Sequence, residues 1–156
     1  MSTLLQAMLS QSVSGQFLTM REVSRFSAAE IRQTMADLVG SNHIELADAL
    51  SAAGLSLYPE SEDILAITGL LALMRQEWAL SVELMEQLRA VQGDKTPPFT
   101  YVMLVRALRC NLDPVRALEV AHEGLKQYPD QIELAAEADT LKDFATSSKA
   151  HATAEH

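Results

Sequence analysis

The stretch Ala47-x6-Gly54-Leu55-x2-Tyr58-Pro59 is repeated further along the chain as Ala117-x6-Gly124-Leu125-x2-Tyr128-Pro129. The two copies begin seventy residues apart and keep five identical residues in one spacing, so the chain contains an internal repeat. Repeats built from two helices and a turn have periods near 34 residues, and seventy is about twice that period. The spacing therefore predicts a helical chain with a third, less similar copy between the two.

Ending each copy just after its proline gives three blocks, residues 28–61, 62–97 and 98–131, of which the middle one is two residues longer. The blocks resemble the tetratricopeptide (TPR) family, whose pattern has an early apolar residue, a small residue, two small residues in a second helix and a closing proline. In block order these five slots hold Ile31, Leu65 and Tyr101; Met35, Gly69 and Val105; Ala47, Ser81 and Ala117; Gly54, Leu88 and Gly124; Pro59, Gly93 and Pro129. The resemblance implies an all-α fold, a superhelical stack of three TPR helix pairs with an N-terminal helical extension and a C-terminal capping helix.

Capping residues mark the helix starts independently of the repeat, because a side-chain oxygen before the first turn satisfies backbone N–H groups that lack an intrahelical partner. Ser27 and Asn42 each stand three residues before a glutamate, which is the capping-box spacing. Thr96 and Asp113 each precede a proline, a favoured first helical residue. With Ser61 as a further cap, the pattern predicts helices at 28–39, 43–57, 62–75, 77–91, 98–110, 114–127 and 131–145.

These helices divide the chain into three parts. Residues 1–27 form the N-terminal helical extension, with a role in dimerisation or docking, and residues 28–145 form the TPR domain with its capping helix. Residues 146–156 are small and polar without periodicity, which predicts a disordered tail. With 156 residues and 48% apolar content, the chain has room for a continuous core.

Composition excludes several classes of function. A net charge of −9 opposes binding to a phosphate backbone, which relies on Lys and Arg, so we expect no nucleic-acid partner. The longest uncharged run, residues 64–74, is shorter than the ~20 residues of a membrane helix, so we expect no membrane insertion. No basic residue precedes Arg21, which argues against a secretion signal, and a single cysteine, Cys110, fits a reducing compartment. We therefore expect a cytoplasmic protein.

The residues that commonly carry catalysis are scattered. The four histidines have no metal-ligand spacing to another His, Cys or carboxylate on one helix face; they are His43, His122, His151 and His156. Cys110 has no paired cysteine motif, and the densest carboxylate cluster, residues 60–63, lies where a helix N-terminus favours negative charge. We expect no enzyme, no catalytic residue, no metal site and no cofactor.

The middle of the chain calls for a partner. Residues 64–74 are apolar on every face and residues 99–105 are nearly so, and a helix that is hydrophobic all round must be buried all round. Mapping the groove-facing spacing of the TPR family onto these helices predicts a client-binding groove of Ala66, Ile67, Leu70, Leu73, Phe99, Val102, Met103, Arg106 and Arg109. An empty apolar groove would be an exposed patch, which the chain's own N-terminal segment, a second copy or a peptide of another protein would cover. The alternative is that Leu70 and Leu73 are ordinary core.

The segments 73–82 and 97–99 are similar to the Hrp-type TPR accessory proteins of bacterial type III secretion, and an N-terminal helix before three repeats is similar to the translocator chaperones of those systems. The resemblance implies a cytoplasmic bacterial chaperone or adaptor that binds an apolar helical or extended segment of an export substrate, or of a needle or rod subunit, in its concave groove. A homodimer and a small helical co-chaperone are further partners that it leaves open. The alternative is a structural scaffold of the secretion apparatus that acts through its N-terminal helix.

Overall fold

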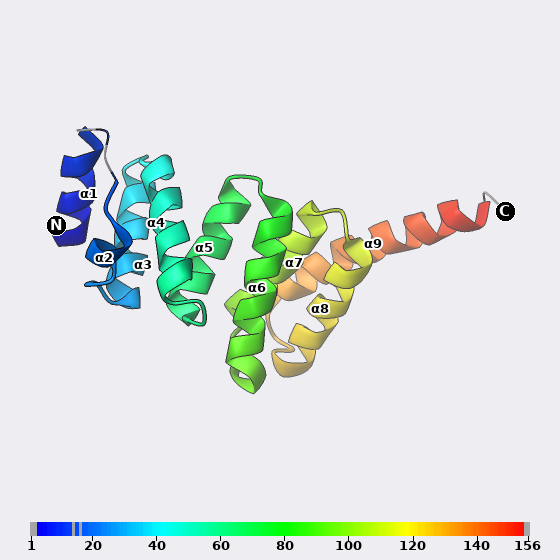
Figure 1. The fold of residues 1–156 in the computed structure, drawn as a ribbon. Helices are drawn as coiled ribbons and strands as arrows, with labels where there is room; N and C mark the ends of the chain where they lie inside the picture. The colour runs from blue at the N-terminus through cyan, green and yellow to red at the C-terminus, as the bar shows by residue number, and fades with distance from the viewer. Residues whose placement is uncertain (1–2, 14, 16, 155–156) are drawn as a thin grey trace. The chain divides into compact units, whose positions relative to one another are not determined.

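The computed structural model describes residues 3–13, 15 and 17–154, with side chains described as far as residue 144. All regular structure in this part of the chain is helical (Figure 1). In chain order the elements are α1 (Thr3–Val13), α2 (Met20–Val23), α3 (Ala28–Gly40), α4 (Ile44–Leu57), α5 (Glu62–Met74), α6 (Trp78–Gln92), the 3-10 helix η1 (Gly93–Lys95), α7 (Pro98–Cys110), α8 (Pro114–Gln127) and α9 (Ile132–Ala154). The chain divides within α5 into two compact units, residues 1–71 and 72–156, and each is described by itself.

The seven helices predicted from the repeat and its caps are confirmed as α3 to α9. Their ends agree with the predictions to within one residue, except at the end of α9. There the helix continues to Ala154, past the predicted end at residue 145, because no glycine or proline follows Ile132 in the helix. The side chains from residue 145 onward lie outside the described ones, so the disordered tail at 146–156 stays a prediction.

Three tight turns join the first and second helix of each repeat, and all three have the same geometry. Asn42, Gln76 and Leu112 have positive φ values of 63°, 63° and 61°. The next residue in each turn donates its backbone N–H to a carbonyl five residues earlier, as in His43 to Leu38 at 2.7 Å. The turns are 34 and 36 residues apart, which reproduces the two extra residues of the middle block. The structure therefore contains the predicted middle repeat.

Two of the predicted caps are wrong, and turn geometry explains both. Asn42 is the left-handed turn residue, and His43, which occupies the N-cap of α4, makes no side-chain cap hydrogen bond. Thr96 donates its hydroxyl to the carbonyl of Gly93 at 2.6 Å within the η1 turn, and α7 begins two residues later. The caps at Ser27, Ser61 and Asp113 are confirmed, since each accepts a backbone N–H three residues ahead.

The conserved spacing of the two strong copies has a packing explanation at its glycine. A Cβ atom on Gly54 would lie 3.4 Å from the side chains of Ile31 and Ile64. At the matching Gly124 it would lie 2.8 Å from Leu134 Cδ1 and 2.9 Å from Tyr101 Cγ. Each glycine thus lets a second helix approach both its own first helix and the first helix of the next repeat.

The tyrosine of the same motif closes each repeat. Tyr58 donates its hydroxyl to the carbonyl of Phe26 at 2.6 Å, and Tyr128 donates to the carbonyl of Thr96 at 2.7 Å, in both cases 32 residues back. The bond ties the end of the second helix to the segment before the first. In the middle block Gln92 takes this place, and its side-chain oxygen accepts the Thr100 hydroxyl at 2.7 Å.

The N-terminal extension is part of the core of the first unit. Leu4, Leu5 and Met8 of α1 are buried at 1%, 8% and 2% exposure, in one cluster with residues of α3, α4 and α5. Contacts join α1 to α3 and α2 to α4. The apolar face of α1 is therefore used inside the chain.

In the second unit α9 follows the repeats as a capping helix. Where α7 has the buried residues Tyr101, Val105 and Leu108, α9 has exposed ones at the matching repeat positions, namely Ala135, Asp139 and Lys142. Leu134, Ala138 and Leu141 of α9 are buried, and α9 contacts α8 and α7. One face of α9 thus closes the core and the other is suited to water.

The two motif glycines predict opposite responses to one substitution. Alanine is favoured over glycine by roughly 1 kcal/mol in a helix interior, and at Gly54 the new methyl group would meet its neighbours at 3.4 Å. We expect Gly54→Ala to leave the thermal midpoint unchanged or raised. At Gly124 the contacts of 2.8 and 2.9 Å force overpacking that costs ~1–3 kcal/mol, so Gly124→Ala should lower the midpoint. Circular-dichroism melts of both variants test this, and equal shifts would contradict it.

Candidate functional site

The residues of the predicted groove belong to both units. Ala66, Ile67 and Leu70 are on α5 in the first unit, whereas Leu73, at the end of α5, and the five residues of α7 belong to the second; those five are Phe99, Val102, Met103, Arg106 and Arg109. The two sets are therefore described separately.

In the first unit, α3 and α5 run in the same direction and share an exposed face. Both helices begin beside the C-terminal end of α4, where Gly54 contacts Ile31 of α3 and Ile64 of α5. Arg32 Nε lies 3.7 Å from Asp63 Oδ1, so these two side chains face one another from the first turns of the two helices. Residues at four and seven positions beyond each of them lie on the same face.

Those positions hold partly exposed apolar side chains. Beyond Arg32 they are Ala36 and Val39, and beyond Asp63 they are Ile67 and Leu70, all of intermediate burial together with the predicted Ala66. We call Ala36, Val39, Ala66, Ile67 and Leu70 the first-unit strip. Sequence analysis missed Ala36 and Val39 as members, although their spacing from Arg32 carries the signal. The strip is an apolar surface edged by an ion pair, which suits contact with apolar side chains of a partner.

In the second unit, most of the predicted apolar residues of α7 are core. Val102 and Met103 are 3% and 8% exposed, because α7 packs against α6, α8 and α9. Phe99, at the start of the helix, is 47% exposed, and Leu73 is partly buried. The expected apolar trough is therefore reduced on α7 to one aromatic ring.

The two predicted arginines of α7 pair with α9. Arg106 reaches Glu133 at 3.1 Å and Glu137 at 3.4 Å, and Arg109 contacts both carboxylate oxygens of Glu137, at 3.1 and 3.3 Å. We call these four residues the α7–α9 ladder; they line an open cleft of about 290 Å3. Glu133 and Glu137 were missed from the sequence, where only their four-residue spacing on one helix marks them. The arginines thus have carboxylate partners within the chain.

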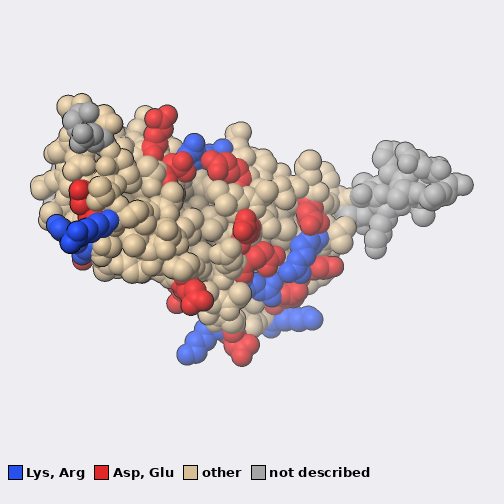
Figure 2. Space-filling model, in the orientation of Figure 1, with Lys and Arg blue, Asp and Glu red and all other residues tan. Residues whose placement is uncertain are grey.

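A second charged network joins α6, α7 and α8 around an open cavity of about 450 Å3. Arg89 hydrogen-bonds Glu123 and lies 5.1 Å from the centre of the Tyr101 ring, while Arg116 reaches Glu86 at 3.5 Å. Burial lowers the pKa of Arg89, but the hydrogen bond and charge of Glu123 outweigh it and leave this pKa raised. Figure 2 shows the red and blue side chains alternating over α6 and α8. Opposite charges that pair across helices stabilise the repeat packing.

The candidate catalytic and metal-binding residues stay apart in the described part of the chain. His43 Nδ1 lies 2.9 Å from the Ser41 hydroxyl in the α3–α4 turn, His122 is exposed on α8, and Cys110 is partly buried at the end of α7. His151 and His156 lie outside the described side chains. Among the residues described, no three His, Cys, Asp or Glu side chains are grouped to hold a metal ion. Within the same residues, every helix is too short or too polar to cross a membrane.

Comparison with solved structures identifies the fold. The first TPR domain of the human RPAP3 protein, solved by NMR, matches with a TM-score of 0.67 and 11% identity, over 78% of this chain and 94% of that domain. The chain has a TPR fold. The assembly chaperone of RpL4 (Acl4, residues 1–338) matches with a TM-score of 0.61 and 13% identity, over 96% of this chain but only 59% of that one. No protein-family model and no curated protein sequence matches the chain.

The ladder predicts unequal roles for its two glutamates. Glu137 is 13% exposed and serves two arginines, whereas Glu133 is 58% exposed and serves one. We expect Glu137→Gln to lower the free energy of unfolding by about 1 kcal/mol, and Glu133→Gln to change it by less than ~0.5 kcal/mol. Urea titrations at low and high salt check this, since the Glu137 effect should shrink as salt screens the partly exposed pairs. Two equal effects would show that burial does not separate the glutamates.

Proposed function

We propose that the protein is a non-enzymatic chaperone or adaptor that binds an apolar segment of another protein. The observation that supports this most directly is the first-unit strip, where five apolar side chains of α3 and α5 keep partial solvent exposure on one shared face. TPR folds bind partners on the surface formed by their first helices. The predicted residues of the second unit that reach solvent, Phe99, Arg106 and Arg109, extend the proposed contact with an aromatic ring and two cations.

The energy available from such a surface is sufficient for specific binding. Burying ~500 Å2 of apolar surface at ~25 cal/mol per Å2 contributes on the order of 12 kcal/mol before the costs of association and ordering. Micromolar to nanomolar affinity is therefore reasonable. The neighbour described as an assembly chaperone of RpL4 shows that a protein with this fold holds a protein client, which supports the same class of role here.

We further propose that the client belongs to a bacterial type III secretion system, as an export substrate or as a needle or rod subunit held in the cytoplasm before secretion. This finer proposal is supported by the similarity of residues 73–82 and 97–99 to the Hrp-type accessory proteins of those systems. The structural comparisons bear on the fold alone. An apolar client that must stay soluble before export fits an acidic carrier with a net charge of −9.

The second candidate is a scaffold of the secretion apparatus that docks through its N-terminal helix. The burial of Leu4, Leu5 and Met8 in the first unit weighs against it, because a partner would have to use the polar side of α1 or replace its packing on α3. For the same reason, deletion of residues 1–27 would uncover the core of the first unit and would test folding as well as docking.

A charge placed on the first-unit strip tests the proposed function. Leu70 is partly exposed, and Leu80 of α6, 39% exposed, is a matched control outside the proposed surface. After purification of the untagged protein from its native cells, we expect a small protein to co-elute in stoichiometric amount with wild type and Leu80→Glu, and to be lost with Leu70→Glu. The helical circular-dichroism signal should be the same in all three.

Two results would contradict the proposal. A clean monomer or homodimer from native cells would show that the strip needs no client. Retention of the co-eluting protein by Leu70→Glu would place its binding site elsewhere. Val102→Glu serves as a reference for core damage, because Val102 is 3% exposed and a buried charge there should reduce the helical signal itself.

A further inference from the structure

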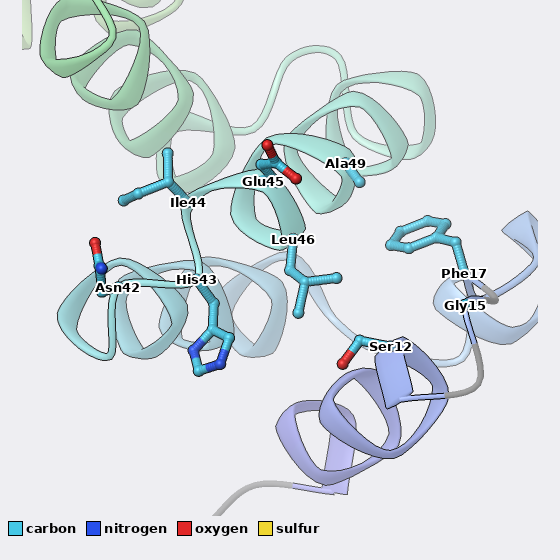
Figure 3. Close-up of a pocket in the computed structure, with 9 residues that line it drawn as sticks. All are labelled: Ser12, Gly15, Phe17, Asn42, His43, Ile44, Glu45, Leu46 and Ala49. Atoms are coloured by element: carbon cyan, nitrogen blue, oxygen red, sulfur yellow. The ribbon is translucent and has the colours of Figure 1, made fainter.

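The first unit carries a second surface, distinct from the strip, beside the start of α4. An open cleft of about 720 Å3 lies between the end of α1, the segment after it and the first turns of α4 (Figure 3). Its lining is Ser12, Gly15, Phe17, Asn42, His43, Ile44, Glu45, Leu46 and Ala49. In Figure 3 the side chains of Phe17, Leu46 and Ala49 face the same space from two different segments. The volume is in the range of ~300–1,000 Å3 typical of binding pockets.

The exposed apolar side chains of the first unit gather next to this cleft. Within the described part of the unit, the large apolar residues that stay most exposed are Val13, Phe17 and Met20, at 90%, 40% and 43%. All three come from the short stretch that leads from α1 into α2. Elsewhere in the unit such side chains are at least partly buried. A cleft with exposed apolar side chains concentrated at its edge is typical of a docking surface.

Charge indicates what the cleft accepts. Between Gln33 and Met74 the sequence has six Asp and Glu residues and no Lys or Arg. One of the six, Glu45, lines the cleft, and Asp48 follows one turn later on α4. A partner that desolvates apolar groups here therefore does so in a negative potential, which attracts Lys and Arg and repels carboxylates.

We infer that this cleft docks a segment of a different protein that places apolar side chains against Phe17 and Leu46 and a Lys or Arg beside Glu45. A second copy of the chain is disfavoured, because it would bring a second acidic cleft against the first. The site is separate from the first-unit strip, so it gives the chain a second partner surface and does not depend on the proposed client.

The test uses the full chain labelled with 15N and two synthetic peptides. One peptide alternates leucine and lysine in a helical pattern, and the other has glutamate in place of lysine. We expect the lysine peptide to shift amide signals of residues around the cleft and the glutamate peptide to leave them unchanged. Phe17→Ser should weaken lysine-peptide binding by about tenfold or more, and Glu45→Gln by about two- to fivefold.

Three control variants locate the binding. Val13→Ser removes a neighbouring exposed apolar side chain outside the lining, Glu60→Gln removes a carboxylate beyond the other end of α4, and Leu70→Glu alters the first-unit strip. Each should change the affinity by less than about twofold. Equal losses at Glu45 and Glu60, loss of binding with Leu70→Glu, binding of the glutamate peptide or the absence of shifts at the cleft would each overturn the inference. So would self-association of the unliganded chain through Phe17, since a second copy would then be the occupant.

Discussion

The close approach of three helices at a single glycine is the constraint on which each repeat depends. At Gly124 a Cβ atom would overlap with Leu134 and Tyr101, and at Gly54 the space is just sufficient. Because the second helix comes so near, the next first helix is held parallel to the previous one. The tyrosine four residues later then ties the repeat shut through a carbonyl 32 residues back. This placement of first helices side by side creates the face on which the strip lies.

Local chemistry was sufficient to predict the helices, and non-local packing explains where prediction failed. Proline and aspartate fix the starts of α7 and α8, so those ends could be read directly. Asn42 and Thr96 have the composition of caps but serve turns, because the chain has to reverse there within a few residues. The predicted groove met the same limit. Periodicity places Val102 on a face of α7, but only the positions of the surrounding helices decide that this face is buried at 3% exposure.

The two units present different chemistry from matching repeat positions. On α3 and α5 of the first unit these positions hold small and aliphatic residues, with one ion pair at the edge. On α7 and α9 of the second unit they hold arginines and glutamates that pair with one another. A ladder of paired charges on a surface contributes little net energy to a partner that must break it. Apolar contacts to the strip are therefore the better source of affinity, and the ladder is better suited to select among partners.

The distribution of charge separates the functions of the acidic residues. The first unit contains eight acidic and three basic residues, all three of the latter at or before Arg32. A uniform excess of carboxylates would only keep the protein soluble, but a long segment without any Lys or Arg also gives its apolar surfaces a direction of preference. Apolar clients with acidic flanks are repelled from both the strip and the α4 cleft, whereas those with basic flanks are attracted. Because hydrophobic burial is non-directional, this electrostatic bias is the part of the surface that can distinguish one apolar segment from another.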